Sequence, residues 1–83
     1  MITSRDFEFE ENFFEFSYNL EIKYSNSKAN EVISIIRDKD DKYWHGEYTN
    51  IYGQKRDIPI DKNENKDIVI ENTCRWYNDM RRN

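Results

Sequence analysis

The sequence is poor in the residues that build cross-links and reactive sites. Its 83 residues include one cysteine, one histidine, one proline and two glycines. One cysteine excludes an internal disulfide framework and is typical of a reducing compartment. One histidine with one cysteine excludes the closed four-ligand set of a structural zinc ion. Two isolated glycines exclude a glycine-rich phosphate loop. We therefore expect no cofactor and no metal.

Long apolar runs are also missing. No stretch approaches the ~18–20 apolar residues of a membrane span, and no basic segment followed by an apolar one opens the chain. We expect a protein without membrane contact, located in the cytoplasm of a bacterial host cell.

Catalytic signatures are equally scarce. His45 and Cys74 are unique in the chain, and a Cys/His dyad needs an activating geometry that no neighbouring motif supplies. Cys74 falls on an apolar helical stripe, which is typical of a buried structural thiol. His45 lies in an aromatic segment, where a surface or interface role is the simpler interpretation. We expect a protein that is not an enzyme.

Aromatic and charged side chains are what the chain has in quantity. It carries five Phe, six Tyr and two Trp, with 36% charged residues. A chain of this length is one domain, residues 1–83, and buries only roughly 60–65% of its unfolded surface. There is room for one sheet against one helix, with a thin aromatic core.

The clearest strand signal runs from Phe14 to Tyr24, where apolar and polar residues alternate six times. Upstream, Phe7 and Phe9 are apolar in the opposite phase, and the switch falls at residues 11–13. A tight turn or a bulge is needed there to keep both segments in phase with the core. With either device we expect the phenylalanines on the buried side.

Three further strands are predicted. Residues 25–30 form a polar connection, residues 31–38 read as a strand interior to the sheet, and residues 39–42 form a hairpin turn. Residues 43–49 give the next strand, and residues 54–60 the last. Pro59 lacks an N–H for the ladder and marks that last strand as an edge.

The C-terminal segment after residue 66 has two interpretations. Its apolar residues recur with helical spacing, and Asn63 or Asn65 is suited to cap the start; the stripe comprises Val69, Thr73, Trp76 and Met80, flanked by Ile70, Cys74 and Tyr77. The β-branched run 68–70 keeps a strand over residues 66–71 open, paired with residues 58–60, before a shorter helix from Asn72. We favour the long helix. The fold class is then α+β, an antiparallel β-meander of four to five strands with a C-terminal helix packed on one face.

Negative charge is concentrated at the front of the chain. Residues 1–41 carry ten acidic and five basic residues, and residues 42–83 carry seven and eight. A net charge of −4 disfavours direct nucleic-acid binding, which relies on Lys and Arg against phosphates, and favours a basic partner.

The acids alternate with the phenylalanines, so they are expected to form solvent-facing rows with ~6–7 Å per two residues. That spacing approximates the ~7 Å between phosphates along a DNA strand. The candidate partner-binding residues are Glu8, Glu10, Glu11, Glu15 and Glu21. The simpler interpretation is that these acids keep the protein soluble and block edge-to-edge strand pairing.

An aromatic and basic segment over residues 42–56 offers an alternative site. Bases stack on exposed aromatic rings beside positive charge, and the candidate residues are Tyr43, His45, Tyr52, Lys55 and Arg56. The simpler interpretation is that alternate members such as Trp44 and Tyr48 face the helix as core.

The whole chain resembles small phage proteins that disarm bacterial defence in its size, its acidity and its composition. The composition is rich in residues with AT-rich codons, namely Phe, Ile, Lys, Asn and Tyr. These phage proteins include anti-CRISPR and anti-restriction proteins, and the chain is similarly like acidic immunity proteins that neutralise nucleases. The resemblance implies an inhibitor that occludes a basic, nucleic-acid-handling protein. Two alternatives stay open: a single-stranded nucleic-acid-binding or regulatory module using residues 42–56, and a subunit of a phage or cellular assembly, including a homodimer, that pairs through edge strands.

Overall fold

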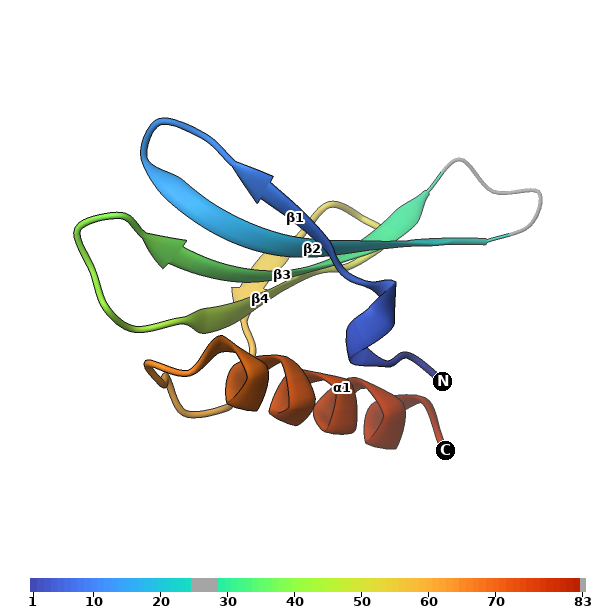
Figure 1. Ribbon diagram of the computed structural model, residues 1–83. Helices are drawn as coiled ribbons and strands as arrows, with labels where there is room; N and C mark the ends of the chain where they lie inside the picture. The colour runs from blue at the N-terminus through green and yellow to red at the C-terminus, as the bar shows by residue number, and fades with distance from the viewer. Residues whose placement is uncertain (25–28, 83) are drawn as a thin grey trace.

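The computed structural model describes residues 1–24 and 29–82. Within them the order of elements is a short 3-10 helix η1 (Ser4–Asp6), strands β1 (Glu8–Glu11), β2 (Glu15–Lys23), β3 (Asn30–Asp38), β4 (His45–Thr49) and β5 (Lys55–Asp57), and helix α1 (Lys66–Arg81). Each strand pairs antiparallel with the one before it, so the sheet order is the chain order. α1 lies along one face of the sheet (Figure 1). The predicted α+β meander with a C-terminal helix is confirmed.

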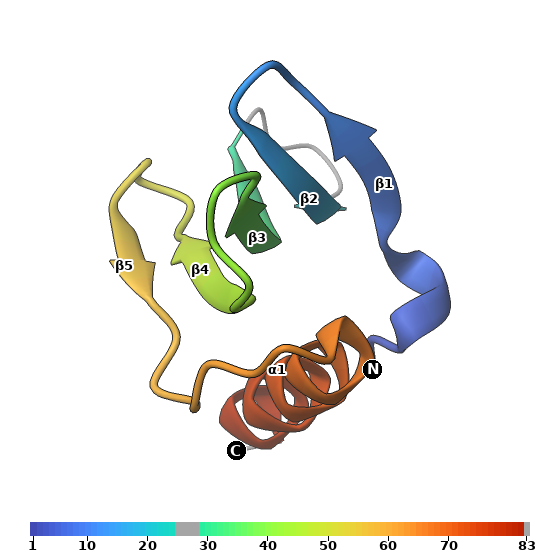
Figure 2. The ribbon, with the colours of Figure 1, turned by 60° about the vertical axis from the view of Figure 1, so that its left-hand side comes forward.

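The sheet is curved. Figure 2 shows its strands as an arc around α1, with β1 and β5 at the two ends of the arc. The face turned toward α1 is called the inner face below, and the opposite face the outer face. No helix in the described part of the chain is long and apolar enough to cross a membrane.

The phase switch in the first hairpin is a turn, not a bulge. The side-chain Oδ1 of Asn12 accepts hydrogen bonds from the backbone N–H groups of Phe14 and Glu15, both at 2.8 Å. This local bond is typical of asparagine in turns. It lets β2 begin at Glu15, one residue later than predicted, and leaves Phe14 in the turn.

The expectation that the phenylalanines all face the core is wrong. Phe7 is buried, but Phe9, Phe13 and Phe14 are 52%, 85% and 76% exposed. The turn that carries Phe13 and Phe14 lies away from α1 in both views (Figures 1 and 2), so no second layer covers it.

The central strands follow the predicted pattern. Ile33 and Ile35 on β3 are fully buried, and β3 pairs on both sides, as predicted for an interior strand. β4 starts at His45, two residues later than predicted; Trp44 before it pairs with Asn63 as an isolated bridge. β5 is the edge strand expected, but it is short and ends at Asp57, before the proline.

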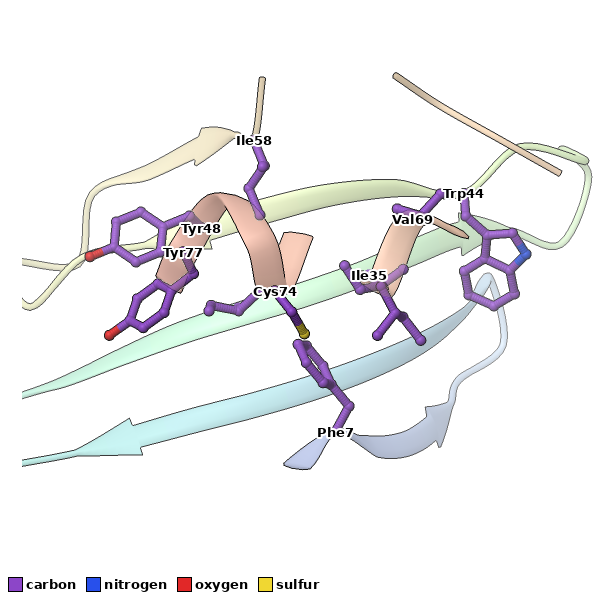
Figure 3. Close-up of a cluster of buried hydrophobic side chains, with 10 residues drawn as sticks. Phe7, Ile35, Trp44, Tyr48, Ile58, Val69, Cys74 and Tyr77 are labelled. Atoms are coloured by element: carbon purple, nitrogen blue, oxygen red, sulfur yellow. The ribbon is translucent and has the colours of Figure 1, made fainter. Parts of the chain in front are cut away.

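The long C-terminal helix is confirmed and the competing hairpin is wrong. Asn65 caps α1 by accepting a hydrogen bond from the N–H of Asp67 at 2.9 Å. The buried face is rotated from the predicted stripe, because Met80 is 37% exposed and Trp76 is only partly buried; the buried members are Val69, Ile70, Thr73, Cys74 and Tyr77. Figure 3 shows Val69, Cys74 and Tyr77 of α1 in the same cluster as Phe7, Ile35 and Trp44. Of the predicted connection 25–30, residues 25–28 lie outside the described part of the chain.

Candidate protein-binding surface

The acids of the first hairpin gather on the outer face of the sheet. Glu8 lies opposite Asn19 and Glu10 opposite Ser17 in the β1–β2 ladder, and residues paired in this way share a face. Tyr18 and Leu20, which alternate with Ser17 and Asn19 on β2, pack against the core. Strand alternation therefore puts Glu15 and Glu21 on the outer face as well. We call these four carboxylates, Glu8, Glu10, Glu15 and Glu21, the acidic strip.

The acidic strip carries negative charge that no lysine or arginine in the described part of the chain neutralises in an ion pair. Glu10 accepts a hydrogen bond from the amide of Asn19 at 2.9 Å, and Glu21 accepts one from the amide of Asn30. Both donors are neutral. Across residues 1–24 and 29–82, none of the four carboxylates forms an ion pair with a lysine or arginine. The strip therefore keeps a negative potential available to a partner.

A hollow of about 290 Å³ opens within the acidic strip. Most of its lining side chains carry oxygen acceptors, and one is a lysine. The lining residues are Asp6, Glu8, Glu10, Asn19, Leu20, Glu21 and Lys23. A hollow of this chemistry suits a lysine or arginine side chain, since carboxylates form charge-assisted hydrogen bonds with both.

Glu11, the fifth predicted acid, lies elsewhere. It is opposite Phe16 in the ladder, which places it on the inner face. Its carboxylate pairs with the Lys39 ammonium at 2.6 Å. The one-residue difference from Glu10 is enough to reverse its direction, because neighbouring strand residues point to opposite faces.

Cations cover the inner face of the same region. The Arg37 guanidinium lies over the rings of Phe16 and Trp44, at 4.9 Å and 5.4 Å from their centroids. Lys39 lies over Phe16 at 5.1 Å and Lys66 over Tyr18 at 5.1 Å. These distances are within cation–π range. At this end of the sheet the acidic strip thus lies outside, and the inner face carries these three cations with one carboxylate, Glu11, paired to Lys39.

Two exposed rings stand beside the acidic strip. Phe13 and Phe14 form an edge-to-face pair with centroids 5.1 Å apart, at the turn between β1 and β2. We call this pair the aromatic tip. Large aromatic side chains are enriched at protein interfaces, where they act as anchors, and exposed ones at a turn are available for that role.

The alternative set predicted over residues 42–56 is not one platform. Tyr43 precedes β4 and Tyr52 follows it, so the two rings lie at opposite ends of the strand. His45 and Lys55 face outward around Glu47, while Arg56 lies over the ring of Tyr48 on the inner face and over the ring of Trp76 on α1. Trp44 and Tyr48 are buried, as the simpler interpretation predicted.

Cys74 and His45 are separated by the sheet. Cys74 is buried on α1 against the inner face, and His45 is half-buried on the outer face. Burial, with the nearby acids Asp6 and Glu71, raises the pKa of the Cys74 thiol to about 11. The thiol is therefore protonated at neutral pH, which is the form that does not attack electrophiles.

A buried polar cluster was not foreseen from the sequence. Glu31, at the start of β3, is fully buried, and four side chains donate to its carboxylate: the hydroxyls of Tyr24, Tyr48 and Tyr77 and the guanidinium of Arg81. Figure 3 shows the hydroxyls of Tyr48 and Tyr77 side by side. Burial opposes ionisation of Glu31, but the donors outweigh it and hold its pKa at about 2.

The Glu31 cluster joins four elements of the structure. Tyr24 follows β2, Glu31 lies on β3, Tyr48 on β4, and Tyr77 and Arg81 on the last turns of α1. Its signal in the sequence is the phase of Glu31, which alternates with Ile33 and Ile35 and so shares their buried face. We assign it the structural role of fixing the end of α1 on the sheet.

The outer surface of the first hairpin thus offers carboxylates, a hollow and exposed rings for recognition. Comparison of the chain with protein-family models, with curated proteins and with solved structures finds no match.

Proposed function

We propose that the protein is a non-catalytic inhibitor that attaches to a basic protein through the acidic strip and the aromatic tip. One observation carries the proposal. Four carboxylates without a cationic partner among the described residues line one face of two paired strands, beside rings that are 85% and 76% exposed. Charge steers the encounter with a basic surface, and the rings supply apolar anchors.

A nucleic-acid-handling protein is the partner class that this surface fits best. The carboxylates of Glu8 and Glu10 are two residues apart on one strand, ~6–7 Å, which approximates the ~7 Å phosphate spacing of a DNA strand. A cleft lined with Lys and Arg for phosphates would accept such a row. The resemblance in size and charge to phage anti-defence proteins makes a bacterial defence nuclease the first target class to test.

The test is charge reversal on one face against charge reversal elsewhere. The variant Glu8→Lys, Glu10→Lys, Glu15→Lys reverses the strip, and the control Asp61→Lys, Glu71→Lys, Asp79→Lys makes the same change in net charge on the loop and helix. Affinity capture from a bacterial lysate should recover a basic protein with wild type and with the control, and lose it with the strip variant.

Measurements with the purified partner then test the mechanism. We expect wild type to inhibit its nucleic-acid binding, with an association rate that falls as salt rises. Equal capture by the strip variant and wild type would overturn the acidic-strip mechanism. Direct binding of a single-stranded oligonucleotide by the chain itself would favour the nucleic-acid-binding alternative instead.

A further inference from the structure

A group of side chains that can ligate a metal ion lies on the outer face, at the opposite edge of the sheet from the acidic strip. His45 and Glu47 are two residues apart on β4 and so share a face. Asp57 on β5 lies directly opposite Glu47 in the ladder. The strand register alone therefore brings one imidazole and two carboxylates together.

One donor-donor distance in this cluster equals that around a small divalent cation, and the others lie within 4.8 Å. The Nε2 atom of His45 lies 3.0 Å from Oε2 of Glu47, and one donor atom from each of His45, Glu47 and Asp57 lies within 4.8 Å of the others. Ligands bound to zinc at ~2.0–2.2 Å are about 3.0–3.5 Å apart in tetrahedral or octahedral geometry. Small side-chain rotations would close the set around an ion.

The local electrostatics favour a cation at this place. Two like charges directly opposite each other in an antiparallel pair destabilise the sheet, and Glu47 and Asp57 are such a pair. The Lys55 ammonium lies 3.7 Å from Glu47, with a side chain that is 65% exposed. Exposed pairs of this kind contribute little, so Lys55 is easily displaced.

Two of the three side chains are partly enclosed. The side chains of His45 and Glu47 are 31% and 21% exposed, and Asp57 is exposed. Beside them is a hollow of about 230 Å³ that is lined by His45, Gly46, Asp57, Ile58, Ile60 and Lys62. Lys62 is the cation at its rim, and it is exposed.

We propose that His45, Glu47 and Asp57 bind one Zn²⁺ ion. Imidazole nitrogen with carboxylate oxygen is a donor set that zinc accepts, whereas magnesium and calcium take oxygen donors almost alone. Three protein ligands leave a further position for water or for a side chain of a partner. This site does not depend on the acidic strip, and its test is separate.

Because His45 is the only histidine in the chain, its imidazole resonances report the site without ambiguity. Titration of ¹⁵N-labelled protein with Zn²⁺, followed by long-range ¹H–¹⁵N spectra, should shift the His45 ring signals with one-to-one stoichiometry. Isothermal titration calorimetry of the same sample gives the affinity.

Two matched variants separate the cluster from general acidity. Asp57→Asn should weaken Zn²⁺ binding at least about tenfold, because even second-shell groups contribute that much to a metal site. Asp38→Asn removes an acid from the same face outside the cluster and should leave the affinity unchanged. Lys55→Gln should strengthen binding, because it removes the competing cation.

Two results would overturn the zinc site. One is a His45 ring that does not respond to a tenfold excess of Zn²⁺. The other is binding that Asp57→Asn and Asp38→Asn weaken equally, since that would show general attraction to an acidic face. Unchanged thermal unfolding of the metal-free variants would show that they fold, and an Asp57→Asn chain that failed to fold would be replaced by Glu47→Gln in the same comparison.

Discussion

At the scale of single residues, Glu31 is a fully buried carboxylate at the centre of a polar cluster. A fully buried carboxylate is unfavourable unless its oxygens are paired. Three tyrosine hydroxyls and Arg81 supply that pairing, and they come from segments up to 50 residues away in sequence. The carboxylate therefore organises contacts among β2, β3, β4 and α1 that apolar packing alone would not specify.

Glu31 makes the stability depend on pH. Its pKa is about 2 in the folded protein and 4.5 ordinarily, so the stabilisation is complete above pH 4.5 and is lost as pH falls toward 2. The shift corresponds to up to about 3 kcal/mol. In Glu31→Gln this acid-side loss should be absent, and the variant should be less stable at pH 7 by roughly 3 kcal/mol, because a neutral amide replaces the buried carboxylate that accepts hydrogen bonds from Arg81 and the three tyrosines.

Urea unfolding at pH values from 7 to 2.5 measures this dependence. Glu8→Gln, which neutralises an exposed acid, is the control and should follow wild type. The prediction fails if the stability difference between wild type and Glu31→Gln stays constant across that range.

A second change in stability is expected at alkaline pH. The hydrogen bond to Glu31 and burial raise the pKa of Tyr24 to about 12, and burial and a hydrogen bond to Glu31 raise the pKa of Tyr48 to about 12. Stability from these hydroxyls should be lost as pH rises from 10 to 12.

The sequence indicates that Glu31 is buried, but it does not indicate which side chains donate hydrogen bonds to it. Alternation with Ile33 and Ile35 puts it on the inner face of a strand, and this could have been predicted. Which hydroxyls and which arginine reach it depends on the register of β2 against β3 and on the docking of α1. Those are long-range features that the local pattern does not contain. The His45, Glu47 and Asp57 cluster escaped prediction for a similar reason, because Asp57 joins it only through the β4–β5 register.

At the scale of elements, the sequence predicted the strands of the first hairpin, but it did not predict that the turn between them is exposed. α1 has 16 residues and is therefore ~24 Å long, whereas the nine residues of β2 span ~30 Å. A single helix of this length leaves one end of the sheet uncovered. Alternation of apolar and polar residues predicted β2, but it does not indicate which part of the strand a helix covers. The exposure of Phe13 and Phe14 was therefore not foreseen.

The aromatic tip should therefore matter for binding and not for stability. Phe13→Ser with Phe14→Ser should change the free energy of unfolding by no more than ~0.5 kcal/mol, because both rings are exposed. The same variant should weaken capture of the basic partner at least about tenfold, as expected for two anchor residues. Quantitative pull-down and urea unfolding measure the two effects.

Phe7 provides the opposite case within the same segment. It is buried against α1, and Phe7→Ala should cost ~3 kcal/mol of stability. If the double serine variant destabilised the protein as much as Phe7→Ala, the tip would be part of the core and its assignment as an anchor would be wrong.

At the scale of the whole molecule, charge is sorted by face. The carboxylates of the acidic strip point outward, while Arg37, Lys39 and Lys66 cover rings on the inner face of the same region. Net charge and the alternation of acids with phenylalanines were enough to predict an acidic row. The separation of Glu11 from that row was not predicted, although Glu11 directly follows Glu10 and strand alternation alone places it on the opposite face.

The central claim is that the outer face of the first hairpin is the surface that meets a basic partner. Amide chemical-shift mapping of the ¹⁵N-labelled chain, titrated with the captured partner, tests this most directly. We predict that the largest shifts and line broadening fall on residues 8–23, centred on β1, β2 and the aromatic tip, and that they diminish as salt is raised. Shifts concentrated instead on α1 or on β4 and β5, with residues 8–23 unperturbed, would contradict the claim.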